Sequence, residues 1–403
     1  NFPPIAGDAM KDRQNLAVVA PFEPGSVFKV ITLATALETT RLTPKSSFHC
    51  GNGRMTLFRR VIHDAHPNGQ LTMQQILAKS SNIGAIKIAL EVGSSRLHEY
   101  LGKFGFGSKT GVPLPGEQRG TVHRLSRWIP SSIGSVAMGH EISTTTLQLA
   151  QACSVIANGG FLVKPKLVIS RDRDGAIEKE SSAVPERVLR PQVANTMRLM
   201  MERVVLEGTG KRARLDGYTS GGKTGSAQIY DAKARIYTHR YNGSYMGFAP
   251  INNPAIVVVI TLNETPSGDR GFGGRVAAPV FREVATAALR LLEVQRDLPD
   301  ELSPLQLDPS GDENDLAIAG LSVPPGEDED GPSQAEAPPR FIGPELPPQL
   351  VGNGPKVPDF HGKSKRDVLS NPCRWAFALR LRVPESPGPN ILLRASFFVR
   401  ERG

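Results

Sequence analysis

Three short motifs occur in a fixed order along this 403-residue chain, and together they constrain its fold more than any other feature. A Ser-x-x-Lys motif runs from Ser26 to Lys29, a Ser-x-Asn motif from Ser80 to Asn82, and a Lys-Thr-Gly motif from Lys223 to Gly225. Each is weak alone, because the chain holds a second Ser-x-x-Lys and a second Lys-Thr-Gly. The order, the spacing and the local context therefore carry the information.

The first motif can pair a nucleophile with a base. A helix is predicted from Val27 to Leu37, so Ser26 and Lys29 would be neighbours on one helical face. A serine hydroxyl is a poor nucleophile and needs an adjacent base. Burial and nearby cations would lower the pKa of Lys29 and make it such a base. A lone match of this kind is more often a helix cap followed by a surface lysine.

The second motif falls in the break between two predicted helices. Ser80 can relay a proton between Lys29 and a leaving amine, and the Asn82 amide can donate to a substrate carbonyl while holding Lys29 in place. The competing interpretation is an ordinary polar break with Asn82 as a helix cap.

The third motif lies on a predicted strand, residues 219–229, which can pair with an extended peptide if it is at a sheet edge. Lys223 supplies positive charge for a substrate carboxylate, and Thr224 and Ser226 supply hydroxyls. Gly225 lets a substrate approach the backbone. Taken alone, this motif could be only a glycine-rich bend.

Two further patterns resemble sites but favour a simpler interpretation. The second Lys-Thr-Gly, at Lys109, continues into a proline-rich loop, residues 112–117, and not into a strand. His63 to His66 does not have the spacing of a helical zinc pair, so polar loop residues are the better interpretation. No metal site is predicted.

The spacing of apolar residues predicts helices in the middle of the chain and strands mostly after them, which indicates an α+β fold. The short connections between the strands favour an antiparallel sheet. Helices are expected at residues 27–37, 72–79, 83–92, 97–105, 144–157 and 276–294. Strands are expected at residues 161–168, 219–229, 244–249 and 255–262, and residues 41–69 are expected to be irregular.

The three motifs together are those of active-site-serine β-lactamases and penicillin-binding proteins. The sequences around Ser26 and Lys223, the loop 105–117 and the segment Tyr245 to Pro250 resemble the class B penicillin-binding proteins of the septal, FtsI-like kind. This resemblance covers residues 1 to about 295 and implies the penicillin-binding transpeptidase, or β-lactamase-like, fold. That fold has a five-stranded antiparallel sheet covered by helices.

The resemblance implies a peptidoglycan D,D-transpeptidase that is inhibited by β-lactams. Ser26 would attack the carbonyl between the last two D-alanines of a stem peptide, and the backbone N–H groups of Ser26 and Ser226 would form the oxyanion hole. No metal or organic cofactor is implied. The implied catalytic residues are Ser26, Lys29, Ser80 and Asn82, and the implied substrate-binding residues are Lys223, Thr224, Gly225 and Ser226.

Charge and resemblance together indicate the partners. The net charge is +9, which suits an anionic polymer or membrane surface and would suit nucleic acid equally well. The resemblance implies peptidoglycan stem peptides and β-lactams, and no nucleic acid. It also implies a role in cell division or cell shape, with a polytopic membrane glycosyltransferase and divisome proteins as partners. The catalytic domain would be extracytoplasmic (periplasmic), held at the inner or plasma membrane by an anchor expected upstream of Asn1.

Two alternatives stay open. One is a serine β-lactamase or D,D-carboxypeptidase, in which water resolves the acyl-enzyme. Ser80-Ser81-Asn82 in place of Ser-Asp-Asn argues against a class A β-lactamase. The other is a non-catalytic β-lactam sensor or wall-binding protein.

The domain boundaries follow from composition. Residues 1–295 are expected to form the transpeptidase domain. Residues 296–355 are expected to be a disordered linker, since residues 301–355 hold eleven prolines and eleven acidic side chains. Residues 356–403 open like a PASTA domain, a small extracellular module, but the resemblance stops after Ser370, so an incomplete module is expected.

Overall fold

The computed structural model describes residues 14–58, 60–168, 170–173, 176–179, 184–231, 236–266, 269–299, 379–382 and 392–395. Its α-helices are α1 (Leu16–Val19), α2 (Lys29–Thr39), α3 (Met73–Lys79), α4 (Asn82–Val92), α5 (Ser94–Lys103), α6 (Ser132–Ala137), α7 (Thr146–Ala157), α8 (Pro191–Leu206), α9 (Gly273–Val276) and α10 (Ala278–Leu291). Its 3₁₀ turns are η2 (Gly25–Phe28), η3 (Leu125–Arg127), η4 (Lys211–Ala213) and η5 (Asp269–Gly271).

The described strands fall into one main sheet and five two-stranded sheets. The strands are β1 (Ser47–Gly51), β2 (Arg54–Leu57), β3 (Arg60–His63), β4 (Gly69–Thr72), β5 (Thr121–Val122), β6 (Ile142–Ser143), β7 (Phe161–Leu162), β8 (Ser170–Arg173), β9 (Ala176–Lys179), β10 (Glu186–Arg187), β11 (Gly221–Asp231), β12 (Ile236–Ala249), β13 (Ile256–Thr265), β14 (Leu379–Arg382) and β15 (Leu392–Ala395). Every described pairing is antiparallel.

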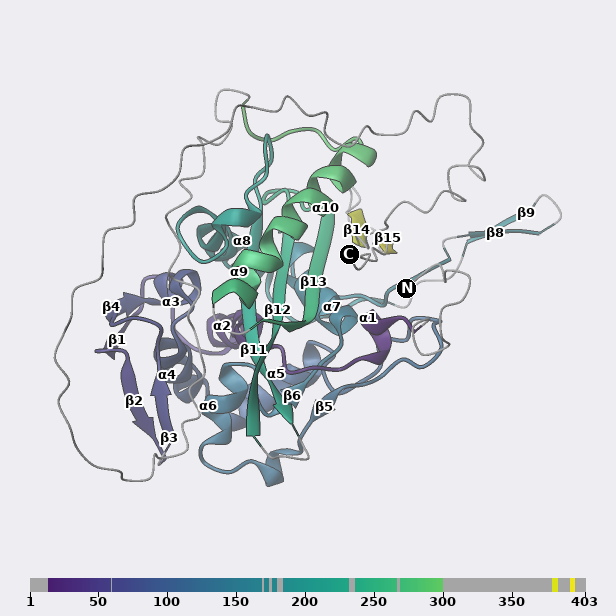
Figure 1. Cartoon of the computed structure of the whole chain (residues 1–403). Coiled ribbons are helices and arrows are strands. Elements are labelled where there is room, and N and C mark those ends of the chain that lie inside the picture. The colour runs from purple at the N-terminus through teal and green to yellow at the C-terminus, as the bar shows by residue number, and fades with distance from the viewer. Residues whose placement is uncertain are drawn as a thin grey trace, which may run out of the picture. The chain divides into compact units, whose positions relative to one another are not determined.

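The main sheet is covered by helices on both faces, and the alternation of side chains along its strands explains why. On β12, Met246 and Phe248 contribute to the larger core under α2, α4, α7 and α8. Tyr245 and Ala249 point to the other face and pack with α10, where the rings of Tyr245 and Phe281 lie 4.6 Å apart. Figure 1 shows α10 lying along β12 and β13. Both faces of the central strands are therefore buried.

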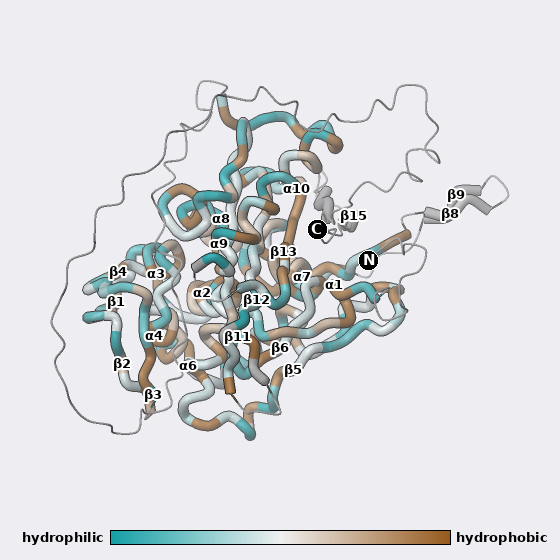
Figure 2. Tube along the Cα trace, viewed as in Figure 1, coloured by the Kyte–Doolittle hydropathy of each residue, from teal (hydrophilic) through white to brown (hydrophobic). Residues whose placement is uncertain are grey.

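The hydrophobic residues follow this arrangement. β13 contains the run Ile256 to Ile260 and is among the most hydrophobic segments in Figure 2. Ile256 and Val258 lie in the core on the face of the sheet that α10 covers. Val257 lies in the larger core on the opposite face. Within the described residues, no helix is long and apolar enough to cross a membrane.

The sheet has five described strands in the order β11-β12-β13-β14-β15. Only three of them lie within residues 1–295, so five strands within the transpeptidase region stay a prediction. β14 pairs with β13 at Ile256 and Val257, so part of the segment assigned to a partial PASTA-like tail lies beside the main sheet. The expected linker beyond residue 299 and the PASTA-like opening lie outside the described residues.

The α+β architecture and most predicted elements are confirmed. Thr72 caps α3 in a capping box with Gln75, as the sequence predicted. Two predictions were wrong. Residues 41–69 are not irregular but carry β1 to β3 and the start of β4, whose strands of four or five residues are too short to show a clear period. The strand predicted at 161–168 ends at Leu162.

One long helix was missed although its signals are present. α8 begins with Pro191 at its first turn, a common helix start. Its buried residues recur every three or four positions, from Val193 and Met197 to Met201 and Val204. The helix packs on α2, α3, α7 and β11, so it contacts elements that carry or adjoin all three motifs.

Candidate active site

Ser26 lies in the turn that enters the central helix. It belongs to η2, and Lys29 begins α2 directly after it. Gly25 has a φ of +57°, which favours glycine, and the backbone of Gly139 lies against it. Ser26 is 8% exposed, whereas Lys29 is fully buried. Ser26 is thus the more accessible of the two. The helix predicted from Val27 begins as a 3₁₀ turn, and its α-helical part starts at Lys29.

The Lys29 ammonium group reaches the second motif. Its Nζ donates to the Ser80 backbone carbonyl at 2.5 Å, to Asn82 Oδ1 at 2.6 Å and to Ser80 Oγ at 3.2 Å. Burial lowers the pKa of Lys29 well below its ordinary value, and the charge of Lys223 lowers that pKa further. The carboxylate of Asp64 opposes this shift. Both conditions that the sequence analysis required of a lysine base are met, namely burial and a nearby cation.

The turn between α3 and α4 presents the second motif. Ser80 ends α3 in the left-handed region, with φ 60° and ψ 33°, a conformation that costs a non-glycine residue about 1 kcal/mol or more. Ser81 caps α4 through its hydroxyl, which accepts from the Gly84 N–H. Asn82 then begins α4. The turn directs the Ser80 carbonyl, the Ser80 hydroxyl and the Asn82 amide at the same lysine.

The third motif lies on β11, at the edge of the described sheet. Lys223 is fully buried, and its Nζ donates to Ser80 Oγ at 2.9 Å and to the Thr224 carbonyl at 3.1 Å. The sequence predicts that Lys223 faces a substrate carboxylate. In the structure its ammonium group lies against Ser80, so its charge acts first on the Ser80–Lys29 pair.

Gly225 brings β11 against the nucleophile turn. A Cβ atom added there would lie 2.4 Å from Ser244 Oγ, 2.9 Å from Val27 Cγ1 and 3.0 Å from the Pro24 carbonyl oxygen. Such distances leave no room for a side chain. Ser226 follows Gly225 and accepts from the Gly273 N–H through its hydroxyl at 3.0 Å.

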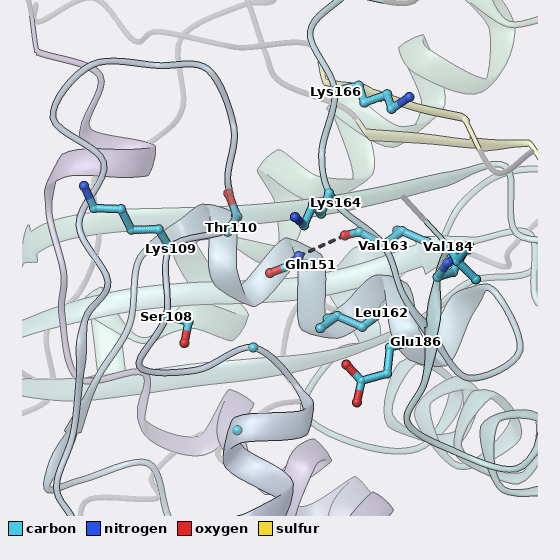
Figure 3. Close-up of a pocket in the computed structure, with 13 residues that line it drawn as sticks. Ser108, Lys109, Thr110, Gln151, Leu162, Val163, Lys164, Lys166, Val184 and Glu186 are labelled. Carbon is cyan, nitrogen blue, oxygen red and sulfur yellow. Dashed lines mark hydrogen bonds between the residues drawn. The ribbon is translucent and has the colours of Figure 1, made fainter. Parts of the chain in front are cut away.

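The structure brings all three motifs together and leaves the second Lys-Thr-Gly out. Thr110, in the second Lys-Thr-Gly, is bonded to Glu117 through both its N–H and its hydroxyl. Lys109 is exposed and, with Gln151 and Lys164, lines a pocket of about 300 Å³ (Figure 3). None of the motif residues assigned to the site lines this pocket. The second Ser-x-x-Lys shares Lys223 with the third motif, and its serine, Ser220, lies directly before β11 and not on a helix.

Several residues of the site were missed from the sequence. Thr209 is buried, and its hydroxyl lies 2.6 Å from that of Thr224. Asp64, interpreted as a polar loop residue, binds the turn of the second motif. Asp64 directly follows a strand and Thr209 lies in a glycine-rich turn, but neither pattern is specific enough to identify a site.

A second polar network lies beside the nucleophile turn. Glu23 accepts from Nδ1 of His140 at 2.9 Å, from the Glu141 N–H at 3.1 Å and from the Tyr237 hydroxyl at 3.3 Å. Arg60 forms an ion pair with Glu141 at 3.0 Å. The network ties the segment before Ser26 to the connection before β6 and to β12. No role had been assigned to His140.

Among the described residues, no cluster of three or more His, Cys, Asp or Glu side chains could hold a metal ion. The site offers two buried lysines, the hydroxyl groups of Ser26, Ser80 and Thr224, and a sheet edge. This set of groups suits nucleophilic acyl transfer by an activated serine.

Comparisons with known proteins give the family. Residues 5–286 match the family described as "Penicillin binding protein transpeptidase domain". Penicillin-binding protein PbpB of Mycolicibacterium smegmatis is 35% identical over 73% of this chain and 47% of the relative. Peptidoglycan D,D-transpeptidase FtsI of Escherichia coli K12 is 30% identical over 78% of this chain and 50% of the relative. The matched region thus spans about half the length of these relatives.

Solved structures agree with the sequence matches. Penicillin-binding protein 3 of Mycobacterium tuberculosis, in complex with ampicillin, has a TM-score of 0.67 at 32% identity, covering 72% of this chain and 66% of that one. The transpeptidase domain of penicillin-binding protein 3 of Burkholderia pseudomallei has a TM-score of 0.64 at 33% identity, covering 71% and 84%. The chain therefore shares the fold of these penicillin-binding proteins.

Proposed function

Because this chain belongs to the penicillin-binding protein transpeptidase family, we propose that it is a peptidoglycan D,D-transpeptidase that uses Ser26 as its nucleophile. One observation carries the proposal: the Ser80 hydroxyl accepts hydrogen bonds from both Lys29 and Lys223, which joins the three motifs into one site. Relatives named peptidoglycan D,D-transpeptidases support the substrate class.

Acylation begins when neutral Lys29 takes the proton of the Ser26 hydroxyl. Its lowered pKa supports this role, because a base must be unprotonated for part of the time. Ser26 Oγ attacks the carbonyl carbon between the last two D-alanines of a stem peptide. The N–H groups of Ser26 and Ser226 stabilise the oxyanion. The C–N bond then breaks, and the terminal D-alanine leaves.

Ser80 supplies the proton that this leaving amine needs. Its oxygen accepts from Lys29 and Lys223, so its own O–H can donate toward the substrate. A proton passed from Lys29 to Ser80 restores the hydroxyl and returns Lys29 to its neutral form. Asn82 has one amide N–H bonded to the His63 carbonyl and offers the other to the substrate carbonyl. Thr224 and Ser226 bind the donor peptide, which lies along the open edge of β11.

The acyl-enzyme is resolved by the amine of a neighbouring stem peptide, which closes a cross-link and releases Ser26. We propose that β-lactams acylate the same serine. No metal or organic cofactor takes part. The proposed setting is the outer face of the inner or plasma membrane, with a membrane glycosyltransferase and divisome proteins as partners. The septal role is supported by the similarity to FtsI.

The hydrolytic alternatives need a base that activates water at the acyl-enzyme. Glu117, in the loop that follows the second Lys-Thr-Gly, is the candidate for such a base that the sequence offers. Its carboxylate accepts from the N–H groups of Thr110 and Gly111 and from the Thr110 hydroxyl, which supports a structural role. A slow release of the β-lactam adduct is therefore expected.

Acyl transfer can be tested directly with a D-Ala-D-Ala stem peptide as donor and a D-amino acid as acceptor amine. We expect the exchanged peptide as the main product in mass spectrometry. A product that is only hydrolysed would favour a carboxypeptidase, and rapid multiple turnover of a penicillin would favour a β-lactamase. Binding of a penicillin without any product would favour the sensor.

A further inference from the structure

Asp64 accepts hydrogen bonds from four donors, three of which belong to the turn that carries the second motif. Its Oδ1 accepts from the N–H groups of Asn82 at 2.6 Å and Ile83 at 3.0 Å. Its Oδ2 accepts from the Ser81 hydroxyl at 2.6 Å and from the Asn68 amide at 3.3 Å. A carboxylate at the first N–H groups of a helix is a stabilising cap. Here the capped helix is α4, whose first residue is Asn82.

The backbone next to Asp64 also fixes the side chain of Asn82. The His63 carbonyl accepts from Asn82 Nδ2 at 2.8 Å, and Asn82 Oδ1 accepts from Lys29 Nζ at 2.6 Å. This pair of contacts decides which way the amide faces, because its oxygen must point to the lysine. The segment His63–Asp64 therefore holds both the backbone and the amide of Asn82. The Asp64 N–H in turn donates to the Gly53 carbonyl at 2.9 Å, which anchors the segment to the β2–β3 hairpin.

Asp64 also contributes charge at the base. The charged groups that act on Lys29 are Lys223, from β11, and Asp64, after β3. They act in opposite directions: Lys223 favours neutral Lys29 and Asp64 favours its protonated form. Lys29 is thus acted on by one cation and one anion that come from different elements of the fold.

We propose that Asp64 is a positioning residue for acylation, which aims Asn82 and Ser80 at Lys29 and balances the charge of Lys223. This inference rests on the proposed function, since acylation of Ser26 is the step that it tunes. Asp64 touches neither the nucleophile nor the base and acts through the Ser81–Asn82 turn.

The test measures the rate of acylation by a fluorescent penicillin between pH 5 and pH 10 for the full chain and its variants. Asp64→Asn removes the charge and one acceptor. We expect the maximum rate to fall by about 10- to 100-fold, as misplaced catalytic groups do. We also expect the acid limb of the profile to move to lower pH, because the pKa of Lys29 falls further when the carboxylate charge is lost. A residue with only a structural role would lower the rate without moving the limb.

Two further variants separate geometry from charge. Asp64→Glu keeps the charge, so its rate should fall while the acid limb stays in place. Glu117→Gln is the matched control, because Glu117 also accepts from two backbone N–H groups but binds a loop that carries no site residue. Its rate and its limb should equal those of the wild type. If Asp64→Asn does not fold, Asp64→Glu decides, and a wild-type rate in that variant overturns the proposal.

The pKa of Lys29 can also be measured by NMR, from the chemical shift of its Cε as pH changes. This measurement tests the inference about Asp64 separately from the proposed function, because it does not require acylation. Asp64→Asn should lower the pKa of Lys29 whether or not Ser26 is acylated. If the penicillin does not acylate the wild-type protein, the proposed function is wrong. A folded Asp64→Asn variant with an unchanged rate, limb and Lys29 titration would refute the inference alone.

Discussion

Lys29 and Lys223 donate hydrogen bonds to the same oxygen atom, Oγ of Ser80, at 3.2 Å and 2.9 Å. Both lysines are fully buried. Two like charges this close in a buried site disfavour each other, which is one reason why the pKa of Lys29 is lowered. The charges of the first and third motifs are thus coupled at the serine of the second motif. The first two predictions below follow from this contact, and the third follows from the packing of β11 beside it.

The first prediction concerns the base. Lys29→Ala should slow penicillin acylation by at least ~10²-fold, the low end for a lost general base. Lys109→Ala, in the second Lys-Thr-Gly, should leave the rate unchanged, because its side chain is exposed and lies outside the site. Stopped-flow fluorescence with a labelled penicillin measures both rates. A larger loss in Lys109→Ala would mean that the wrong motif copy was assigned.

The second prediction concerns pH. Acylation should accelerate as pH rises through the lowered pKa of Lys29, because only the neutral amine accepts the Ser26 proton. Lys223→Ala removes the neighbouring cation and should raise the pKa of Lys29, so the acid limb of the rate profile moves to higher pH. This direction is opposite to that expected for Asp64→Asn. An acid limb that stays in place in Lys223→Ala would show that the two lysines are not coupled.

The third prediction concerns Gly225. Gly225→Ala should destabilise the fold by about 1–3 kcal/mol, as overpacking does, because its Cβ would lie 2.4 Å from Ser244 Oγ. Acylation should slow too, since β11 must move away from the nucleophile turn. Gly102→Ala is the control, because no atom lies within 4 Å of its added Cβ and it sits in helix α5. That variant should be stabilised by up to about 1 kcal/mol. Urea unfolding compares the two, and equal stabilities would contradict the packing argument.

The fourth prediction concerns the C-terminal residues. Deletion of residues 301–403 should leave penicillin acylation unchanged. These residues contribute β14 and β15. β14 pairs with β13, and β12 and β13 separate both strands from the sheet edge at β11. A melting temperature that falls while acylation stays intact would fit the β13–β14 pairing. Loss of acylation in the shortened chain would show that the tail supports the site.

The sequence predicted the parts of the fold whose signals are local. The Thr72–Gln75 capping box, the helix after Ser26 and the strand that carries Lys223 depend on residues close together in the chain, and all three are present. The strand pairs of residues 47–72, β1 with β4 and β2 with β3, were not predicted. Strands of four or five residues are stabilised by the strands that they pair with, so their own alternation of apolar and polar residues is too short to identify them.

The site was only partly predictable, because many of its contacts join segments that are far apart in the sequence. Motif order identified Ser26, Lys29 and Lys223, but it could not show that Lys223 contacts Ser80. That contact depends on how β11 packs against the turn after α3. Asp64 was interpreted as a loop residue because its function arises only when the loop after β3 meets the start of α4.

Covalent labelling at Ser26 tests the central claim most directly. The chain is incubated with benzylpenicillin, and its intact mass is measured over several hours, followed by peptide mapping. We expect an increase by one whole penicillin, located at Ser26, that persists over that time. Ser26→Ala should gain no mass and should melt at nearly the wild-type temperature. Undiminished labelling of the folded Ser26→Ala protein, or an adduct on another residue, would contradict the assignment of the nucleophile.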